Sequence, residues 1–214
     1  MIQKHTLVVG PFQCNCSVLV CAKTKEAIVI DAGDEFDRIK AWVESQGASV
    51  KYSVHTHAHL DHIGAVEALK KWRPQTKICL HKADEGLYKN LAMQGQLFGI
   101  KYDSPPPIDQ FIEHEEVLKF GDHKFSVIHT PGHSPGGVCL RFEGGELAPE
   151  PVVFSGDTLF QQSIGRTDLW GADHGALIRS IKDRLLTLDE QTRVYPGHGP
   201  ATTIAVEARE NPFL

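Results

Sequence analysis

The sequence has few cysteines, no long apolar segment and no excess of basic residues. An odd number of cysteines, five, argues against a disulfide framework and favours reduced thiols. No apolar stretch reaches the roughly 18 residues of a transmembrane helix, and residues 1–10 lack the pattern of a secretory signal. With 22 basic against 27 acidic residues, no basic surface for nucleic acid is indicated. We therefore expect a cytoplasmic protein that binds neither membranes nor nucleic acids.

The sequence does contain enough apolar material, 41% hydrophobic residues, for a single domain over residues 1–214. Alternating apolar runs predict strands, and apolar residues at helical spacing predict helices. The expected strands are 3–9, 17–21, 27–30, 50–54, 77–80, 117–120, 124–129, 138–142, 152–155 and 193–195. The expected helices are 35–46, 63–73, 83–97, 176–186 and 203–211. Residues 99–112 are expected to form a long loop, which serves either as a substrate lid or as surface filler.

This order of elements predicts an α+β fold. Strands joined by hairpin turns begin both halves of the chain, and helices are dispersed between later strands. We expect an αββα sandwich, in which two mixed β-sheets are flanked by helices. A doubly wound parallel sheet is the weaker alternative, because hairpins at the start of both halves do not fit it.

Residues 55–62 hold four histidines and one aspartate within eight positions, which packing does not explain. Other polar loops that follow predicted strands carry His133, Asp157 and His198 beside glycines. Side chains on strand-end loops gather at one edge of a sheet, where sites are usually built. An isolated histidine is more often a core or surface residue than a ligand, but such a cluster is rarely accidental. The set of five histidines and two carboxylates suits two ions: His57, His59, Asp61, His62, His133, Asp157 and His198.

These residues resemble the motif of a known family. Residues 56–62, followed in order by Gly132-His133, Gly156-Asp157 and Gly197-His198, resemble the metallo-β-lactamase superfamily and its glyoxalase II (hydroxyacylglutathione hydrolase)-like branch, in the short single-domain bacterial type. The resemblance implies that His57, His59 and His133 hold a first metal ion. It implies Asp61, His62 and His198 for a second, with Asp157 bridging the two. Two divalent ions are thus expected, zinc first, with iron or manganese as alternatives.

Four further residues belong to this resemblance. Asp31 matches an aspartate that orients a ligating histidine through its other ring nitrogen, although it could also be only a turn residue. Cys14 and Cys16 resemble a structural element of the family and not a metal-binding pair. Arg166, in an element shared by the short glyoxalase II type and persulfide dioxygenases, either clamps a substrate carboxylate or pairs with Asp168. The role of His55 stays open.

The implied activity is hydrolysis of a thioester, S-D-lactoylglutathione or a related glutathione thioester. Two ions sharing a water lower its pKa from that of bulk water to about 7, which gives a hydroxide nucleophile that Asp61 would orient. Longer relatives grip glutathione with a C-terminal helical region that is not expected here, so recognition of glutathione is left open. The alternatives are a mononuclear-iron persulfide dioxygenase, a lactone hydrolase, or a metal-binding domain without catalysis.

Replacing Asp61 by Asn is expected to leave the fold intact and to slow thioester hydrolysis by about 100-fold or more, because the amide keeps the size of the carboxylate but loses its charge. Thermal unfolding and the rate of thioester hydrolysis, measured on one preparation, check this expectation. Full activity in the variant would show that Asp61 does not take part.

Overall fold

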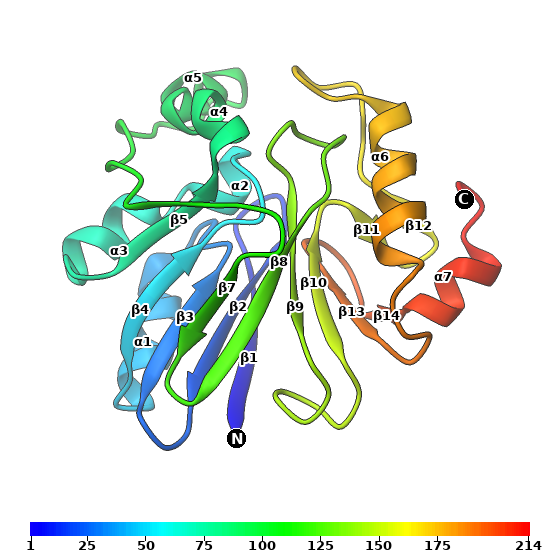
Figure 1. Cartoon of the computed structure of the whole chain (residues 1–214). Helices are drawn as coiled ribbons and strands as arrows, with labels where there is room; N and C mark the ends of the chain where they lie inside the picture. Colours follow the sequence, from blue (N-terminus) through cyan, green and yellow to red (C-terminus); the bar gives the residue numbers. More distant parts are fainter. The chain divides into compact units, whose positions relative to one another are not determined.

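The computed structural model describes the whole chain, residues 1–214, and the contacts divide it into two compact units (Figure 1). The first unit comprises Met1–Ile112 and Phe120–His123, and the second comprises Glu113–Lys119 and Lys124–Leu214. Most strands of each unit belong to one six-stranded sheet. This division does not test the prediction of a single domain over 1–214, which stays a prediction.

The first unit is built on a mixed sheet. Its strands pair antiparallel from β1 to β3 and parallel from β3 to β6. In sheet order they are β1 (Ile2–Val9), β2 (Cys14–Cys21), β3 (Glu26–Ile30), β4 (Ser49–Val54), β5 (Lys77–His81) and β6 (Gln110–Ile112). β2 and β3 are buried almost throughout, as expected for central strands covered on both faces, and their β-branched residues suit the pleated backbone.

Helices cover this sheet along apolar stripes. They are α1 (Phe36–Ser45), α2 (Leu60–Ile63), α3 (Val66–Trp72), the 3₁₀ turn η1 (Lys82–Asp84), α4 (Glu85–Lys89) and α5 (Leu91–Leu97). Ile39 and Val43 of α1, one turn apart, pack in the same buried cluster as Val18 and Val29 of the strands. A second cluster joins Ile63 and residues of α4 and α5 to β5. The short α2, which follows β4 after the loop over residues 55–59, is therefore fixed by packing.

The second unit carries the other mixed sheet. Its order is β14 (Thr202–Thr203), β13 (Arg193–Pro196), β10 (Val152–Gly156), β9 (Val138–Phe142), β8 (His123–His129) and β7 (Val117–Phe120). β10 and β13 are parallel, whereas β13–β14, β9–β10 and β8–β9 are antiparallel. The remaining elements are the hairpin of β11 (Leu159–Phe160) and β12 (Ser163–Ile164), α6 (His174–Ser180), the π-helix η2 (Ile181–Leu185) and α7 (Ile204–Glu210).

Two mixed sheets with flanking helices confirm the predicted fold class. The expected helix over 83–97 is interrupted, because Asn90 leaves helical geometry and its side chain donates to the carbonyl of Gly86. The expected loop over 99–112 ends in β6, which pairs parallel to β5. The expected helix over 176–186 begins at His174 and widens into a π-helix at Ile181. Each difference arises from a local hydrogen bond or a pairing that apolar spacing does not reveal.

Replacing Glu207 by Ala is expected to lower the free energy of unfolding by about 3 kcal/mol. The Glu207 carboxylate is fully buried and accepts hydrogen bonds from Gln162 N (2.9 Å), Thr202 Oγ1 (2.5 Å) and Asn211 Nδ2 (2.8 Å), donors that would be left unsatisfied. Urea unfolding measures the loss. Glu210→Ala on the same helix is the matched control, because Glu210 is exposed, and a change within about 0.5 kcal/mol is expected there.

Candidate metal centre

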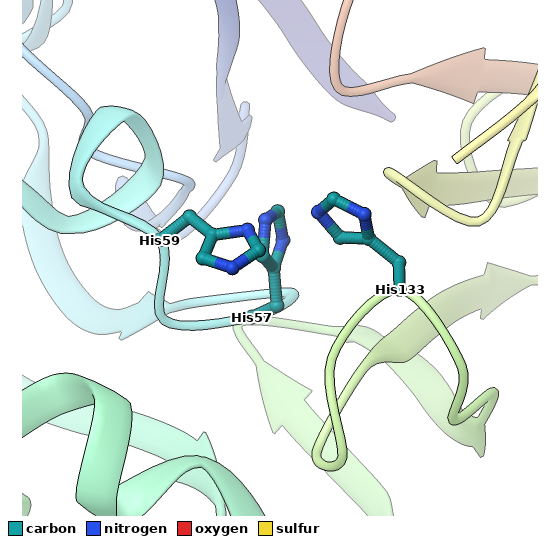
Figure 2. Close-up of side chains that lie close together, drawn as sticks. All are labelled: His57, His59 and His133. Atoms are coloured by element: carbon teal, nitrogen blue, oxygen red, sulfur yellow. The ribbon is translucent and has the colours of Figure 1, made fainter. Parts of the chain in front are cut away.

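The potential ligands of the first unit lie on the loop after β4 and on α2. Figure 2 shows His57 and His59 on that loop. Their ring centroids are 4.7 Å apart, and their ring planes meet at 88°. The rings of His57 and His62 are 4.0 Å apart, and His62 Nε2 lies 3.6 Å from Asp61 Oδ2. His57 and His62 are almost fully buried, and Asp61 is 18% exposed. The predicted ligands of this unit are thus brought together in a histidine-rich cluster able to bind metal.

Two polar side chains hold the backbone around His59. Asp84 Oδ2 accepts from Ala58 N at 3.0 Å. Gln94 Oε1 accepts from Leu60 N at 3.0 Å, while its Nε2 donates to Ala58 O at 2.9 Å. Neither residue is predicted from the sequence. Asp84 follows the strand β5, so the same strand-end pattern that marked the other loops would have marked it, whereas Gln94 has no such signal.

Glycine is required where the loop after β3 meets α2. A Cβ on Gly33 would lie 1.7 Å from the carbonyl oxygen of Asp61, and a Cβ on Gly64 would lie 2.4 Å from the carbonyl oxygen of Gly33. No side chain fits at either contact. The two backbone segments therefore touch directly, and this contact fixes the position of Asp61.

Asp31 lies behind the cluster and is buried. Its Oδ1 accepts from Thr56 N at 2.7 Å, and its Oδ2 accepts from Thr56 Oγ1 at 2.8 Å. The same Oδ2 lies 3.0 Å from His62 Nδ1, and Cys14 Sγ lies 3.6 Å from that nitrogen. Burial raises the pKa of the Cys14 thiol to about 12, so Cys14 stays protonated at neutral pH. His62 is thus held through Nδ1, and its Nε2 lies on the side of Asp61.

His55 contacts the backbone of α2. It is fully buried, its Nδ1 lies 2.9 Å from the carbonyl oxygen of His62, and its Nε2 lies 3.1 Å from Ser53 Oγ. Because a carbonyl only accepts, Nδ1 carries the proton and Nε2 accepts from the Ser53 hydroxyl. Burial lowers the pKa of His55, which keeps the imidazole neutral. Both ring nitrogens are engaged by the protein, so His55 is a structural residue and not a ligand.

The potential ligands of the second unit follow three strands. His133, also labelled in Figure 2, lies on the loop between β8 and β9, while Asp157 follows β10 and His198 follows β13. Asp157 Oδ2 lies 3.6 Å from His133 Nε2 and 3.5 Å from His198 Nε2. Because β10 and β13 run parallel, their carboxyl ends meet at one edge, where Gly197 N donates to Gly156 O at 2.7 Å. The carboxylate of Asp157 is therefore shared between two imidazoles.

Arg166 contributes a backbone contact to this group. Its carbonyl oxygen lies 2.9 Å from His133 Nδ1, which leaves Nε2 of that ring toward Asp157. The exposed Arg166 guanidinium pairs with Asp168 through two contacts, Nε–Oδ1 at 2.7 Å and Nη2–Oδ2 at 2.8 Å. This is the pairing that the sequence left open. The substrate clamp stays a prediction.

A family model of the metallo-β-lactamase superfamily matches residues 9–198, and the chain belongs to this superfamily of metallo-hydrolases. It is 37% identical to the probable metallo-hydrolase YqgX of Bacillus subtilis over 96% of this chain and 94% of that protein. It is 38% identical to the hydroxyacylglutathione hydrolase GloC of Haemophilus influenzae, over 96% and 95%. The predicted resemblance, including its glyoxalase II-like branch, is confirmed.

Solved structures agree with the family. BLEG-1 B3 metallo-beta-lactamase superposes with a TM-score of 0.88 at 39% identity, covering 99% of both chains. TTHA1623, solved in a di-iron-bound form, gives a TM-score of 0.86 at 40% identity, covering 98% of this chain and 100% of its own.

None of the helices described above has the length and hydropathy needed to cross a bilayer.

Replacing His55 by Ala is expected to lower the free energy of unfolding by about 2 to 4 kcal/mol and to weaken metal binding, because the carbonyl of His62 and the hydroxyl of Ser53 lose their buried partner. Urea unfolding and the metal content after dialysis measure these effects. His174→Ala, at an exposed histidine outside the cluster, is the control that should change neither. Unchanged metal content in the His55 variant would show that α2 holds its position without the brace.

Proposed function

We propose that this chain is a thioester hydrolase that depends on two divalent metal ions and acts on S-D-lactoylglutathione or a related glutathione thioester. The observation that carries the proposal is the cluster of the buried His57, His59 and His62 with the partly exposed Asp61, whose members are held by surrounding protein groups. The 38% identical relative named hydroxyacylglutathione hydrolase supports the choice of substrate class.

The proposed ligand sets follow the family pattern. His57, His59 and His133 would hold one ion, and Asp61, His62 and His198 the other, with Asp157 shared between them. The residues fit this role, because the rings of His62 and His133 are each held at Nδ1, by Asp31 and by the carbonyl of Arg166, which leaves Nε2 as the ligand atom. Imidazole and carboxylate donors suit zinc, iron or manganese, and we propose zinc as the first choice.

The chemistry divides between the ions and the protein. Two bound ions supply Lewis acidity, which polarises a carbonyl and makes water a nucleophile at neutral pH. Asp61, the partly exposed carboxylate of the cluster, would orient the attacking water and hold its proton. The thiol of the product has a pKa of about 8.5, so the thiolate leaves without a strong general acid. The buried imidazoles would remain neutral ligands throughout.

A second function rests on one observation. The element Gly165-Arg166-Thr167-Asp168 resembles that of persulfide dioxygenases, which would use a single iron and consume oxygen. In this chain Arg166 pairs with Asp168, and the Arg166 carbonyl holds His133, so the element has a structural use that any activity of this site would need. We therefore place the dioxygenase second, and a lactone hydrolase with the same ions third.

Removing the metal with a chelator is expected to abolish hydrolysis of S-D-lactoylglutathione, and adding zinc back should restore it. Metal analysis should give about two ions per chain, falling to about one in His198→Ala and staying at two in the control His174→Ala. Thioester hydrolysis, oxygen uptake with glutathione persulfide and lactone hydrolysis are measured on the same preparation. One iron per chain with oxygen uptake, or hydrolysis of lactones alone, would contradict the proposal.

A further inference from the structure

Four large apolar side chains of the first unit are exposed close to one another in sequence or in space. They are Phe12 (36% exposed), Met93 (60%), Leu97 (79%) and Phe98 (55%), and we call this group the apolar rim. Met93 and Leu97 lie one turn apart on α5, and Phe98 follows directly. Phe12 and Phe98 contact edge to face, with ring centroids 5.1 Å apart at 83°. Distant segments thus bring their exposed aromatic rings together.

Phe12 belongs to a turn that contacts Asp34 and Glu35, next to the Gly33 backbone that touches Asp61. Gly10 N, in this turn between β1 and β2, donates to Glu35 Oε2 at 3.0 Å. A Cβ on Gly10 would lie 2.9 Å from the Cβ of Asp34. Asp34 follows Gly33, whose backbone touches the carbonyl of Asp61. The turn that carries Phe12 is therefore one contact away from the segment that positions Asp61.

Phe98 is connected to the loop of His59 through Gln94. Gln94 lies one helical turn before Phe98, and it hydrogen bonds to the peptide groups on both sides of His59. Tyr102, in the segment 99–112, packs where a side chain on Gly64 or Gly95 would stand. Burial, with the nearby carboxylates of Asp34 and Asp61, raises the pKa of Tyr102 to about 12, so the phenol stays neutral. Gln94 and Tyr102 therefore connect the segment that carries Phe98 with the part of the cluster that holds His59 and Asp61.

An exposed pair of aromatic rings with exposed apolar neighbours, connected to such a cluster, is typical of a binding surface. A glutathione thioester offers two parts to it, an acyl group and a tripeptide with carboxylate and ammonium charges. The four side chains of the apolar rim are uncharged, so they themselves offer no partner for the charges of the tripeptide. An aliphatic or aromatic acyl group, in contrast, gains about 0.8 kcal/mol for each methylene that it buries. The acyl group is therefore the part that the rim suits.

We propose that the apolar rim binds the acyl group of the substrate, and that the enzyme prefers thioesters with extended apolar acyl groups over those with small hydroxyacyl groups. This inference rests on the proposed thioester hydrolase function and narrows its substrate class. Phe12 and Phe98 are the residues that would set the preference, since their rings contact each other and come from separate segments of the chain.

The test compares S-acylglutathiones from acetyl to hexanoyl, together with S-D-lactoylglutathione, on the metal-loaded enzyme. We expect kcat/KM to rise about two- to fourfold for each added methylene. In the double variant F12A/F98A the rise should disappear, with at least about a tenfold larger loss for the hexanoyl than for the acetyl thioester. Phe111→Ala is the matched control, because Phe111 is also partly exposed (37%) in the same unit but its ring contacts Lys82 and is not part of the rim. In this variant kcat/KM should still rise with each added methylene.

Binding of two non-hydrolysable thioethers separates this inference from the proposed function. S-Hexylglutathione should bind at least about tenfold more tightly than S-methylglutathione, and F12A/F98A should remove the difference, as calorimetry would measure. If no thioester is hydrolysed but S-hexylglutathione still binds more tightly than S-methylglutathione, the proposed function fails. The inference that the apolar rim binds apolar groups is then still supported. Equal binding of the two thioethers, or a difference that survives in F12A/F98A, overturns the inference. It is also overturned if the wild type is a dimer that F12A/F98A converts to monomers without changing selectivity, since a second copy then covers the rim.

Discussion

The carboxylate of Asp31 is the contact on which the arrangement of the first unit depends. It accepts from the backbone and the hydroxyl of Thr56 and also meets the ring of His62, so it ties the start of the histidine loop to the helix that ends it. A buried carboxylate is stable only when its lone pairs are satisfied, and here three donors satisfy them. The loop cannot shift without leaving a buried charge unpaired, which makes its conformation specific.

Backbone peptide groups take part in many of the hydrogen bonds that position the potential ligands. The carbonyl of Arg166 holds His133, the carbonyl of His62 is held by His55, and the peptide groups beside His59 are held by Gln94. Because a carbonyl is present at every position, these contacts depend on the path of the chain and only weakly on residue identity. The contribution of the partner side chains, in contrast, depends on residue identity, since each supplies a donor or acceptor in a fixed direction.

The sequence predicted the features that depend on local pattern. Alternation and helical spacing located most strands and helices, and the spacing of residues 55–62 located the histidine cluster. It did not predict β6, because three residues after a proline-rich segment carry no periodic signal and gain their strand only from pairing with β5. It left His55 open and missed Gln94 for a similar reason. Their roles come from tertiary hydrogen bonds across 7 and 34 to 36 positions, which no local pattern encodes.

Because β9 and β10 pair antiparallel, their connection and the residue Asp157 lie at opposite ends of β10. Phe142 lies opposite Val152, so the connection over residues 143–151 leaves the sheet at the end away from Asp157. Its residues are exposed or half-buried. A fluorescent label, an affinity tag or an inserted peptide placed in residues 143–151 would be tolerated by the fold and would report on the protein from a distance, without touching the histidines.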